Sequence, residues 1–77
     1  MKVEIKYFGM LAEITGCSTE RFTVVDLKMA GLKKELLKKY PDFANTDFRM
    51  AQNKELVTDT TLLTGKEIAV LPPFAGG

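Results

Sequence analysis

The sequence predicts an α+β domain in which a mixed sheet of about five strands carries one main helix across one face and a short second helix. Three observations lead to this prediction. Two segments of strand-like alternation open the chain, a segment of helical period follows, and three short strand-like segments occupy the second half. With 77 residues, the chain has the length of one domain.

The first strand is predicted from strict alternation near the start of the chain. Val3, Ile5 and Tyr7 are separated by residues that suit the opposite face. A period of two is typical of a strand with one face on the core, so these three side chains are expected to point inward. Residues 10–15 lie between two glycines, and we expect a short helical turn there with Gly16 near its C-terminal cap.

The second strand and the main helix follow in turn. Residues 18–25 are expected to pair antiparallel with the first strand, with Phe22 and Val24 facing inward. Asp26 is expected to cap the main helix, although the pattern also allows a start as late as Met29. The apolar face of this helix is predicted from residues three and four apart: Met29, Leu32, Leu36 and Tyr40.

The second half of the chain is expected to return to strands. Gly31 costs the main helix about 1 kcal/mol relative to alanine, and Pro41 ends it by biasing the preceding residue out of helical geometry. Ile68 and Val70 are predicted to face the core, whereas the inward face of the third strand is not assigned by the pattern. The expected segments are a loop at 41–47, strands at 48–52, 55–57 and 67–71, and a polar loop at 59–65 with Leu62 and Leu63 as an apolar plug.

This order of elements is that of the β-grasp arrangement, in which a hairpin precedes a helix that crosses one face of a mixed sheet. The first and last strands can then lie side by side and parallel, because a long crossover connects them. Residues 1–71 are expected to form the domain and residues 72–77 an extended C-terminal tail.

The composition excludes several classes of function. The net charge is +1, which argues against a nucleic-acid binder. There is no histidine, so the usual general base near pH 7 is missing, and one cysteine cannot form an intrachain disulfide. No apolar run resembles a signal peptide or a membrane span, so a reducing cytoplasm is the expected location. We expect no metal and no bound cofactor.

The C-terminal tail carries the strongest functional signal. Two prolines at 72–73 favour a stiff, extended exit from the last strand. Phe74 places an aromatic side chain on this tail, and Ala75, Gly76 and Gly77 then offer almost no side-chain bulk. Such a tail can be threaded into a narrow slot of a partner, where glycine accepts unusual backbone angles. The reacting group is then expected to be the Gly77 carboxylate, a poor electrophile until it is activated as an acyl-adenylate.

The chain resembles the small, sulfur-carrying subunit of molybdopterin synthase, within the ubiquitin-like β-grasp sulfur carriers. The most specific part is the C-terminal Leu-Pro-Pro-Phe-Ala-Gly-Gly, which looks like that family's signature. Ala12 and Lys66 depart from the family, which commonly has arginine and an acidic residue there; the departures concern partner docking. The matching segments are residues 7–16, Leu36 to Pro41, residues 51–53, residues 65–70 and residues 71–77.

The resemblance implies a mechanism in which the chain has no turnover of its own. An ATP-dependent activating enzyme would adenylate Gly77, and sulfur from a persulfide donor would convert it to a thiocarboxylate. Residues Phe74, Ala75 and Gly76 would thread with it into the large subunit of molybdopterin synthase, in a heterotetramer. Sulfur would pass to cyclic pyranopterin monophosphate, so the chain serves as the non-catalytic carrier subunit of a sulfurtransferase.

A partner surface is also expected next to the tail. Phe8 and Leu71 lie opposite the core positions of their strands, and with Ala69 they would form an exposed apolar strip leading toward Phe74 if those strands are neighbours. Packing of Phe8 under a loop is the alternative. Cys17 is interpreted as an ordinary loop thiol rather than the sulfur carrier.

Other functions fit the sequence less well but stay open. A carrier of thiazole or cysteine biosynthesis would share the Gly-Gly end and the adenylation chemistry. A ubiquitin-like modifier would be attached to lysine through Gly77. A plain interaction module would use no chemistry at its tail. The lysine-rich face of the main helix could bind an acidic partner, although a solvated face is the simpler interpretation.

Overall fold

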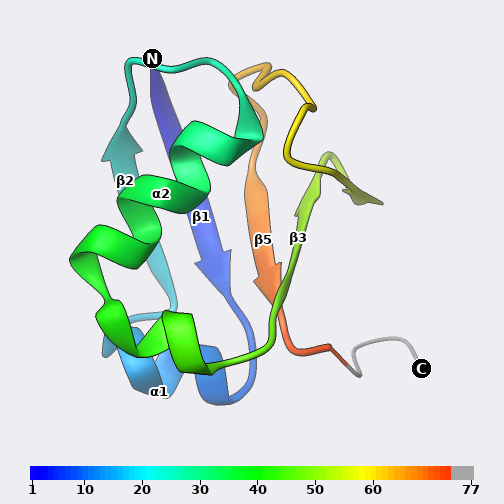
Figure 1. Cartoon of the computed structure of the whole chain (residues 1–77). Coiled ribbons are helices and arrows are strands. Elements are labelled where there is room, and N and C mark those ends of the chain that lie inside the picture. The colour runs from blue at the N-terminus through cyan, green and yellow to red at the C-terminus, as the bar shows by residue number, and fades with distance from the viewer. Residues whose placement is uncertain (74–77) are drawn as a thin grey trace.

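The computed structural model describes residues 1–73 and confirms the predicted ubiquitin-like β-grasp fold (Figure 1). Five strands form one sheet in the order β2-β1-β5-β3-β4, and α2 crosses one of its faces. No helix among the described residues is long and apolar enough to span a membrane. The elements are β1 (Lys2–Tyr7), α1 (Met10–Thr15), β2 (Thr19–Thr23), α2 (Met29–Lys39), the 3₁₀ helix η1 (Pro41–Asn45), β3 (Arg49–Gln52), β4 (Glu55–Leu56) and β5 (Ile68–Leu71).

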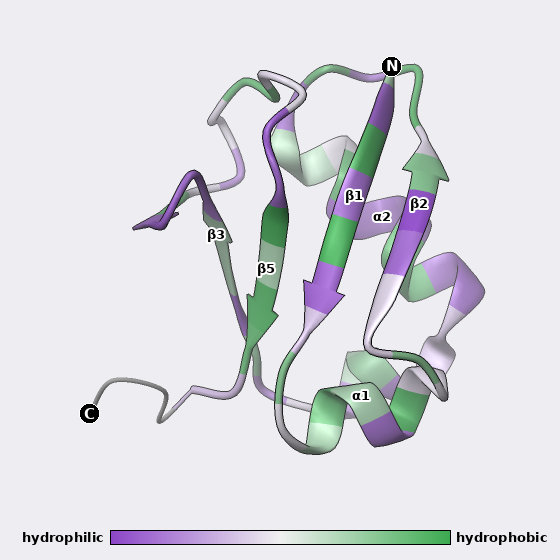
Figure 2. Ribbon diagram, turned by 180° about the vertical axis from the view of Figure 1, so that it is seen from behind, coloured by the Kyte–Doolittle hydropathy of each residue, from purple (hydrophilic) through white to green (hydrophobic). Residues whose placement is uncertain are grey.

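The first and last strands are neighbours, as predicted. β1 pairs in parallel with β5, with Tyr7 opposite Val70, and antiparallel with β2. β3 pairs antiparallel with β5 and carries the short β4 at the edge. Figure 2 shows the sheet from behind, with α2 on its far side, so the face toward the viewer carries no helix. The parallel pair therefore brings the ends of β1 and β5 to the same end of the sheet.

The inward faces of the strands agree with the predicted alternation. Val3, Ile5 and Tyr7 are buried, as are the inward pairs of the second and last strands. In the third strand, which the pattern left unassigned, Met50 is buried on the core, whereas Ala51 is buried on the opposite face of the sheet. The core consists of Val3, Ile5, Tyr7, Leu11, Phe22, Val24, Met29, Leu32, Leu36, Phe43, Met50, Leu63, Ile68 and Val70.

The start of α2 differs from the capping expected at Asp26. The helix begins at Met29, at the late limit of the sequence range, and Lys28 occupies the N-cap position without a side-chain hydrogen bond. The first free backbone donors are satisfied by a distant loop instead: the amide of Met29 donates to the carbonyl of Thr61 at 2.8 Å, and that of Ala30 to Asp59 at 3.0 Å. Tertiary contacts thus replace the local cap that sequence rules assume.

Gly31 has a packing role that offsets its cost in helix propensity. A Cβ atom at this position would lie 2.5 Å from the Cβ of Asp26, closer than real contacts allow. Asp26 is held there by its own turn, since its carboxylate accepts a hydrogen bond from the amide of Lys28 at 2.9 Å. Glycine therefore lets the loop before α2 fold back against the first turn of the helix.

Two further segments correct the sequence expectations. Residues predicted as a plain loop after Pro41 form the 3₁₀ helix η1, because Phe43 is drawn into the core and packs against Phe48 with ring centroids 5.2 Å apart. The predicted apolar plug is formed by Leu63 alone, which is buried, whereas Leu62 is 61% exposed.

A polar cluster around Glu20 ties β2 to the end of α2. Its carboxylate accepts hydrogen bonds from the hydroxyls of Tyr7 and Tyr40, each at 2.8 Å, and it pairs with Lys39. Burial by itself would raise the pKa of Glu20, but the hydrogen bonds from Lys39 and the two tyrosines outweigh it and hold the pKa below the ordinary value of 4.5. Burial and the hydrogen bond to Glu20 raise the pKa of both tyrosines, so both remain donors at neutral pH.

We predict that Glu20→Gln lowers the free energy of unfolding by about 1–2 kcal/mol at neutral pH, because it removes a charged hydrogen-bond acceptor. The folded-state pKa of Glu20 lies below 4.5, so its contribution is complete above that pH and is lost as the pH falls through the folded-state value. Urea unfolding at several pH values should show the two proteins converging at acid pH. Glu35→Gln, an exposed change on α2, is the matched control and should leave stability nearly unaltered.

Candidate functional site

The residues expected to carry the chemistry lie at the end of the chain. Phe74, Ala75, Gly76 and Gly77 fall outside the described residues, so their predicted roles stay predictions. The described part of the chain fixes the root of the tail, which is the point where β5 ends and the prolines begin. The geometry of that root shows which surface the tail leaves from.

The root of the tail lies against the turn between β1 and α1. The amide of Phe8 donates a hydrogen bond to the carbonyl of Val70 at 3.1 Å, which extends the parallel pairing to the last residues of the sheet. Gly9 follows with a φ of 59°, in the region that favours glycine, and a Cβ atom there would lie 3.1 Å from the Cγ of Pro72. Glycine therefore allows this turn and the tail root to sit side by side.

An apolar strip runs along the open face of the sheet up to this root. Phe8 is 44% exposed, and Ala69 and Leu71 are half-buried. The strip forms one wall of a shallow hollow of about 630 Å³. The residues that line the hollow are Phe8, Ala51, Asn53, Lys54, Leu56, Lys66, Glu67, Ala69 and Leu71. The packing of Phe8 under a loop, which the sequence left open, is not what the structure has.

Two members of this hollow were missed by sequence reasoning. Ala51 is aligned with Ala69 in the pairing of β3 with β5, and Leu56 extends the apolar surface from β4 with 61% exposure. The side of the sheet on which Ala51 lies could not be assigned from the sequence, because the third strand lacks clear alternation of apolar and polar residues. The available signal was Leu56 itself, one of two apolar residues in the short strand predicted at 55–57.

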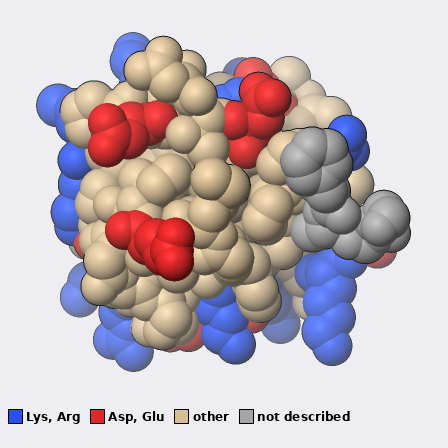
Figure 3. Space-filling view, turned by 90° about the horizontal axis from the view of Figure 1, so that it is seen from below, with Lys and Arg blue, Asp and Glu red and all other residues tan. Residues whose placement is uncertain are grey.

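Charged side chains surround the hollow. Lys54 and Lys66 line it, and Glu67 pairs with Lys6 at 3.4 Å on its border. An apolar centre with a charged margin is the usual anatomy of a protein–protein interface. Figure 3 views the molecule from below, from the end that carries α1. Most of this surface is neither acidic nor basic, acidic side chains form separate patches within it, and lysines and arginines lie mainly along its margin. The root of the tail thus borders a surface suited to a protein partner.

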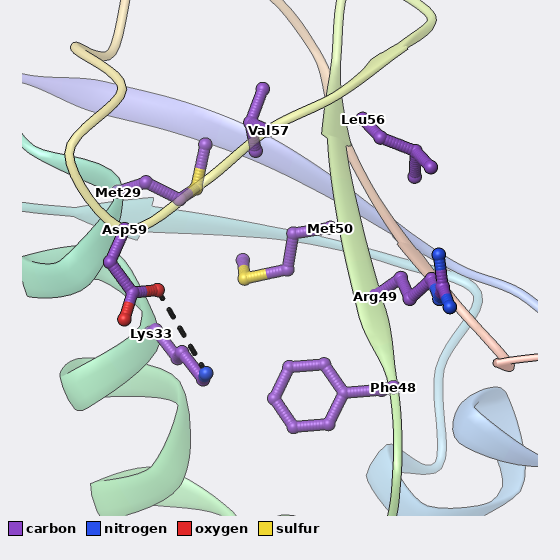
Figure 4. Close-up of a pocket in the computed structure, with 8 residues that line it drawn as sticks. All are labelled: Met29, Lys33, Phe48, Arg49, Met50, Leu56, Val57 and Asp59. Atoms are coloured by element: carbon purple, nitrogen blue, oxygen red, sulfur yellow. Dashed lines mark ion pairs between the residues drawn. The ribbon is translucent and has the colours of Figure 1, made fainter.

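A second hollow, of about 240 Å³, lies between α2 and β3 (Figure 4). Phe48, Met50 and Met29 point into it, and Lys33 pairs with Asp59 across one side at 3.9 Å. It forms where the helix stops covering the sheet. Among residues 1–73, no group of three or more His, Cys, Asp or Glu side chains could hold a metal ion.

Cys17 has local hydrogen bonds and also packs against the edge of the core, near Tyr40. Its thiol lies 3.6 Å from the hydroxyl of Thr15, which also donates a hydrogen bond to the carbonyl of Cys17 at 2.9 Å. The side chain is half-buried in the turn that follows α1. These contacts fit the structural role expected for this thiol.

Comparison with known proteins decides the family. The model of the ThiS family matches residues 5–77, which includes the tail. The chain belongs to the ThiS family. It is also 36% identical to the molybdopterin synthase sulfur carrier subunit of Homo sapiens, over 99% of this chain and 94% of that protein. The family model covers the domain and the C-terminal Gly-Gly together.

Solved structures agree with this family membership. SAMP1 of Haloferax volcanii, a small archaeal modifier protein, superimposes with a TM-score of 0.82 at 25% identity, over 100% of both chains. A chain from the complex of subunits 1 and 2 of the molybdopterin-converting factor of Helicobacter pylori matches with a TM-score of 0.68 at 28% identity, also over 100% of both chains. The fold of this ThiS-family chain is therefore shared by carriers and modifiers.

We predict that Phe8→Ala changes the free energy of unfolding by less than about 1 kcal/mol, because the side chain lies on the uncovered face of the sheet. Phe43→Ala is the matched control: this phenylalanine is 1% exposed, and its loss should cost about 3–5 kcal/mol. Urea denaturation of the three proteins measures both values. A large loss of stability in Phe8→Ala would place this residue in the core and contradict the assignment of the strip.

Proposed function

We propose that this ThiS-family chain carries sulfur as a thiocarboxylate on Gly77 and delivers it within molybdopterin synthase. The chain is a sulfur carrier of molybdenum cofactor biosynthesis on the strength of its family and of its relative named molybdopterin synthase sulfur carrier subunit. The observation that carries the finer proposal is the family match through residue 77, which includes a tail ending in Gly76-Gly77. It acts as a non-catalytic small subunit.

The chemistry assigned to the tail needs a partner enzyme at each step. The Gly77 carboxylate attacks the α-phosphate of ATP, pyrophosphate leaves, and the acyl-adenylate becomes electrophilic at carbon. A persulfide sulfur then displaces AMP, and reduction of the resulting acyl disulfide by a thiol leaves the thiocarboxylate. The chain has no histidine to serve as a base near neutral pH, so these steps fall to an ATP-dependent activating enzyme that also binds the nucleotide.

The large synthase subunit is proposed to bind the apolar strip of Phe8, Ala69 and Leu71 together with Phe74. The match to a chain from a complex of two such subunits supports a partner of this kind. The root of the tail lies at the end of the strip, so one partner can contact the strip and receive residues 74–77 at the same time. A heterotetramer and a cytoplasmic location belong to the same proposal.

A role as a protein modifier is the second candidate, because SAMP1 shares the fold over its whole length. Both functions begin with adenylation of Gly77 and differ in the acceptor. A modifier forms an amide with a lysine side chain, whereas a carrier exchanges oxygen for sulfur. Carriers of thiazole or cysteine biosynthesis would differ only in the final acceptor of sulfur.

We predict that incubation with ATP, an activating enzyme and a persulfide donor raises the intact mass of the chain by one exchange of oxygen for sulfur, located at Gly77. Deletion of Gly77, or addition of one residue after it, should abolish the exchange without lowering the melting temperature, because the described core lies within residues 3–70. Cys17→Ala should accept sulfur normally. Sulfur bound at Cys17, or no mass change, would contradict the proposal; lysine-linked conjugates would favour the modifier.

We predict that Phe8→Ala weakens binding to the large subunit about 30-fold, which corresponds to about 2 kcal/mol for a buried aromatic anchor. Isothermal titration calorimetry with the intact 77-residue chain gives the affinity. The matched control is Leu62→Ala, which also removes a large exposed apolar side chain but does not line the hollow. Equal effects of the two changes would show that the strip is not the binding surface.

A further inference from the structure

β2 is the outermost strand of the sheet, and its free edge is unpaired in the described structure (Figure 1). The amide of Tyr7 donates to the carbonyl of Ser18, and the amide of Val24 donates to the carbonyl of Met1. Because peptide groups alternate in direction along an antiparallel strand, every second residue between Ser18 and Val24 faces away from β1. Those residues are Thr19, Arg21 and Thr23. Within residues 1–73, no other segment pairs with this edge.

The helix that lies over β2 is strongly basic. Residues 28–39 contain five lysines and one glutamate, a net charge of +4, whereas the whole chain has +1, so the remainder carries −3. This positive charge reaches the edge at both ends of the strand. Lys39 pairs with Glu20 and lies over the Phe22 ring, 5.3 Å from its centroid. Lys34 lines a shallow hollow of about 480 Å³ together with residues 23–26, Gly31 and Glu35, so two carboxylates, those of Asp26 and Glu35, lie beside its ammonium group.

The side chains along the edge of β2 indicate which kind of strand could pair with it. A second copy of this chain, pairing antiparallel about Arg21, would place the two arginines opposite each other and bring two basic helices together, which is destabilising. An apolar strand would find Thr19, Arg21 and Thr23 on the outer face, and Val25 as the one large exposed apolar side chain in residues 18–25 to cover. Arg21 already lies 3.9 Å from the carboxylate of Glu4, but its side chain is 80% exposed, so an acidic strand could pair with it and with the lysines of α2.

We propose that the edge of β2 and the basic face of α2 dock an extended, acidic segment of a partner protein, which adds a sixth strand to the sheet. Its backbone would bond to the free peptide groups of β2, as in other cases of strand addition. One carboxylate would lie opposite Arg21 on the outer face. Residues of the other parity would face α2, with acidic side chains near Lys34 and an apolar one near Val25, which is 95% exposed.

This surface is separate from the apolar strip beside the tail. β1 lies between β2 and β5, and the strip is formed from residues at or beyond β5 together with Phe8. A partner held at β2 would therefore leave the root of the tail free. The chain could bind such a partner and the sulfur-accepting subunit at the same time.

The probe is an end-capped synthetic peptide of aspartates with a single valine, acidic on both faces of the strand it would form, added to the ¹⁵N-labelled 77-residue chain. Amide chemical shifts should change at Thr19, Arg21 and Thr23, and those amides should exchange more slowly with solvent. Arg21→Glu should weaken binding about tenfold, because an attractive pair becomes a repulsive one. Lys54→Glu makes the same charge change at the β3–β4 turn and should have little effect.

A second peptide, N-methylated at every other residue on the side that would bond to β2, separates strand addition from attraction by charge alone. It should not bind. Binding that survives methylation, or shifts confined to α2, would overturn the proposal, as would shifts at Phe8, Ala69 and Leu71. Concentration-dependent shifts at β2 without peptide would assign the edge to a second copy, and a response to anionic lipid vesicles equal to that with peptide would assign the lysines to a membrane surface.

Discussion

The parallel pairing of β1 with β5 is the interaction on which the rest of the molecule depends. It joins Ile5 and Tyr7 to Ile68 and Val70, four fully or almost fully buried side chains at the centre of the sheet. Parallel strands need a crossover, so the segment between them must pass over one face, and α2 does so. The same pairing brings the root of the tail, at Pro72, to the β1–α1 turn. The pairing of β1 with β5 therefore both forms the centre of the core and places the root of the tail.

A domain of this size has few buried residues, and its polar groups often connect several elements. Glu20 joins β2 to the residues at the end of α2, and the loop around Thr61 satisfies the first amides of that helix. Gln52 clamps the same loop, since its side chain donates to the carbonyl of Leu62 at 3.0 Å and accepts from the amide of Thr64 at 3.1 Å. These bonds connect separate elements of the domain, whereas the proposed chemistry takes place at Gly77.

In the proposed mechanism the tail carries the reacting group and the domain binds the partner proteins. The carboxylate of Gly77 needs no catalytic neighbour in its own chain if partner enzymes supply the activation and the acceptor. The domain then serves to present the tail and to be recognised. The apolar strip next to the root and the open edge of β2 lie on different parts of the sheet, so recognition by two partners does not require one to leave first.

The sequence by itself determined the fold class and the inward faces of β1, β2 and β5, because alternation is a local property. Its terminal residue types are also the basis on which the tail is proposed as the reactive end. Tertiary structure decided the rest. The facing of β3 depended on its neighbour β5, and the start of α2 on carbonyls from a distant loop. Phe43 turned a loop into η1 by entering the core. Burial and hydrogen bonds between distant residues outweighed local propensity at each of these points.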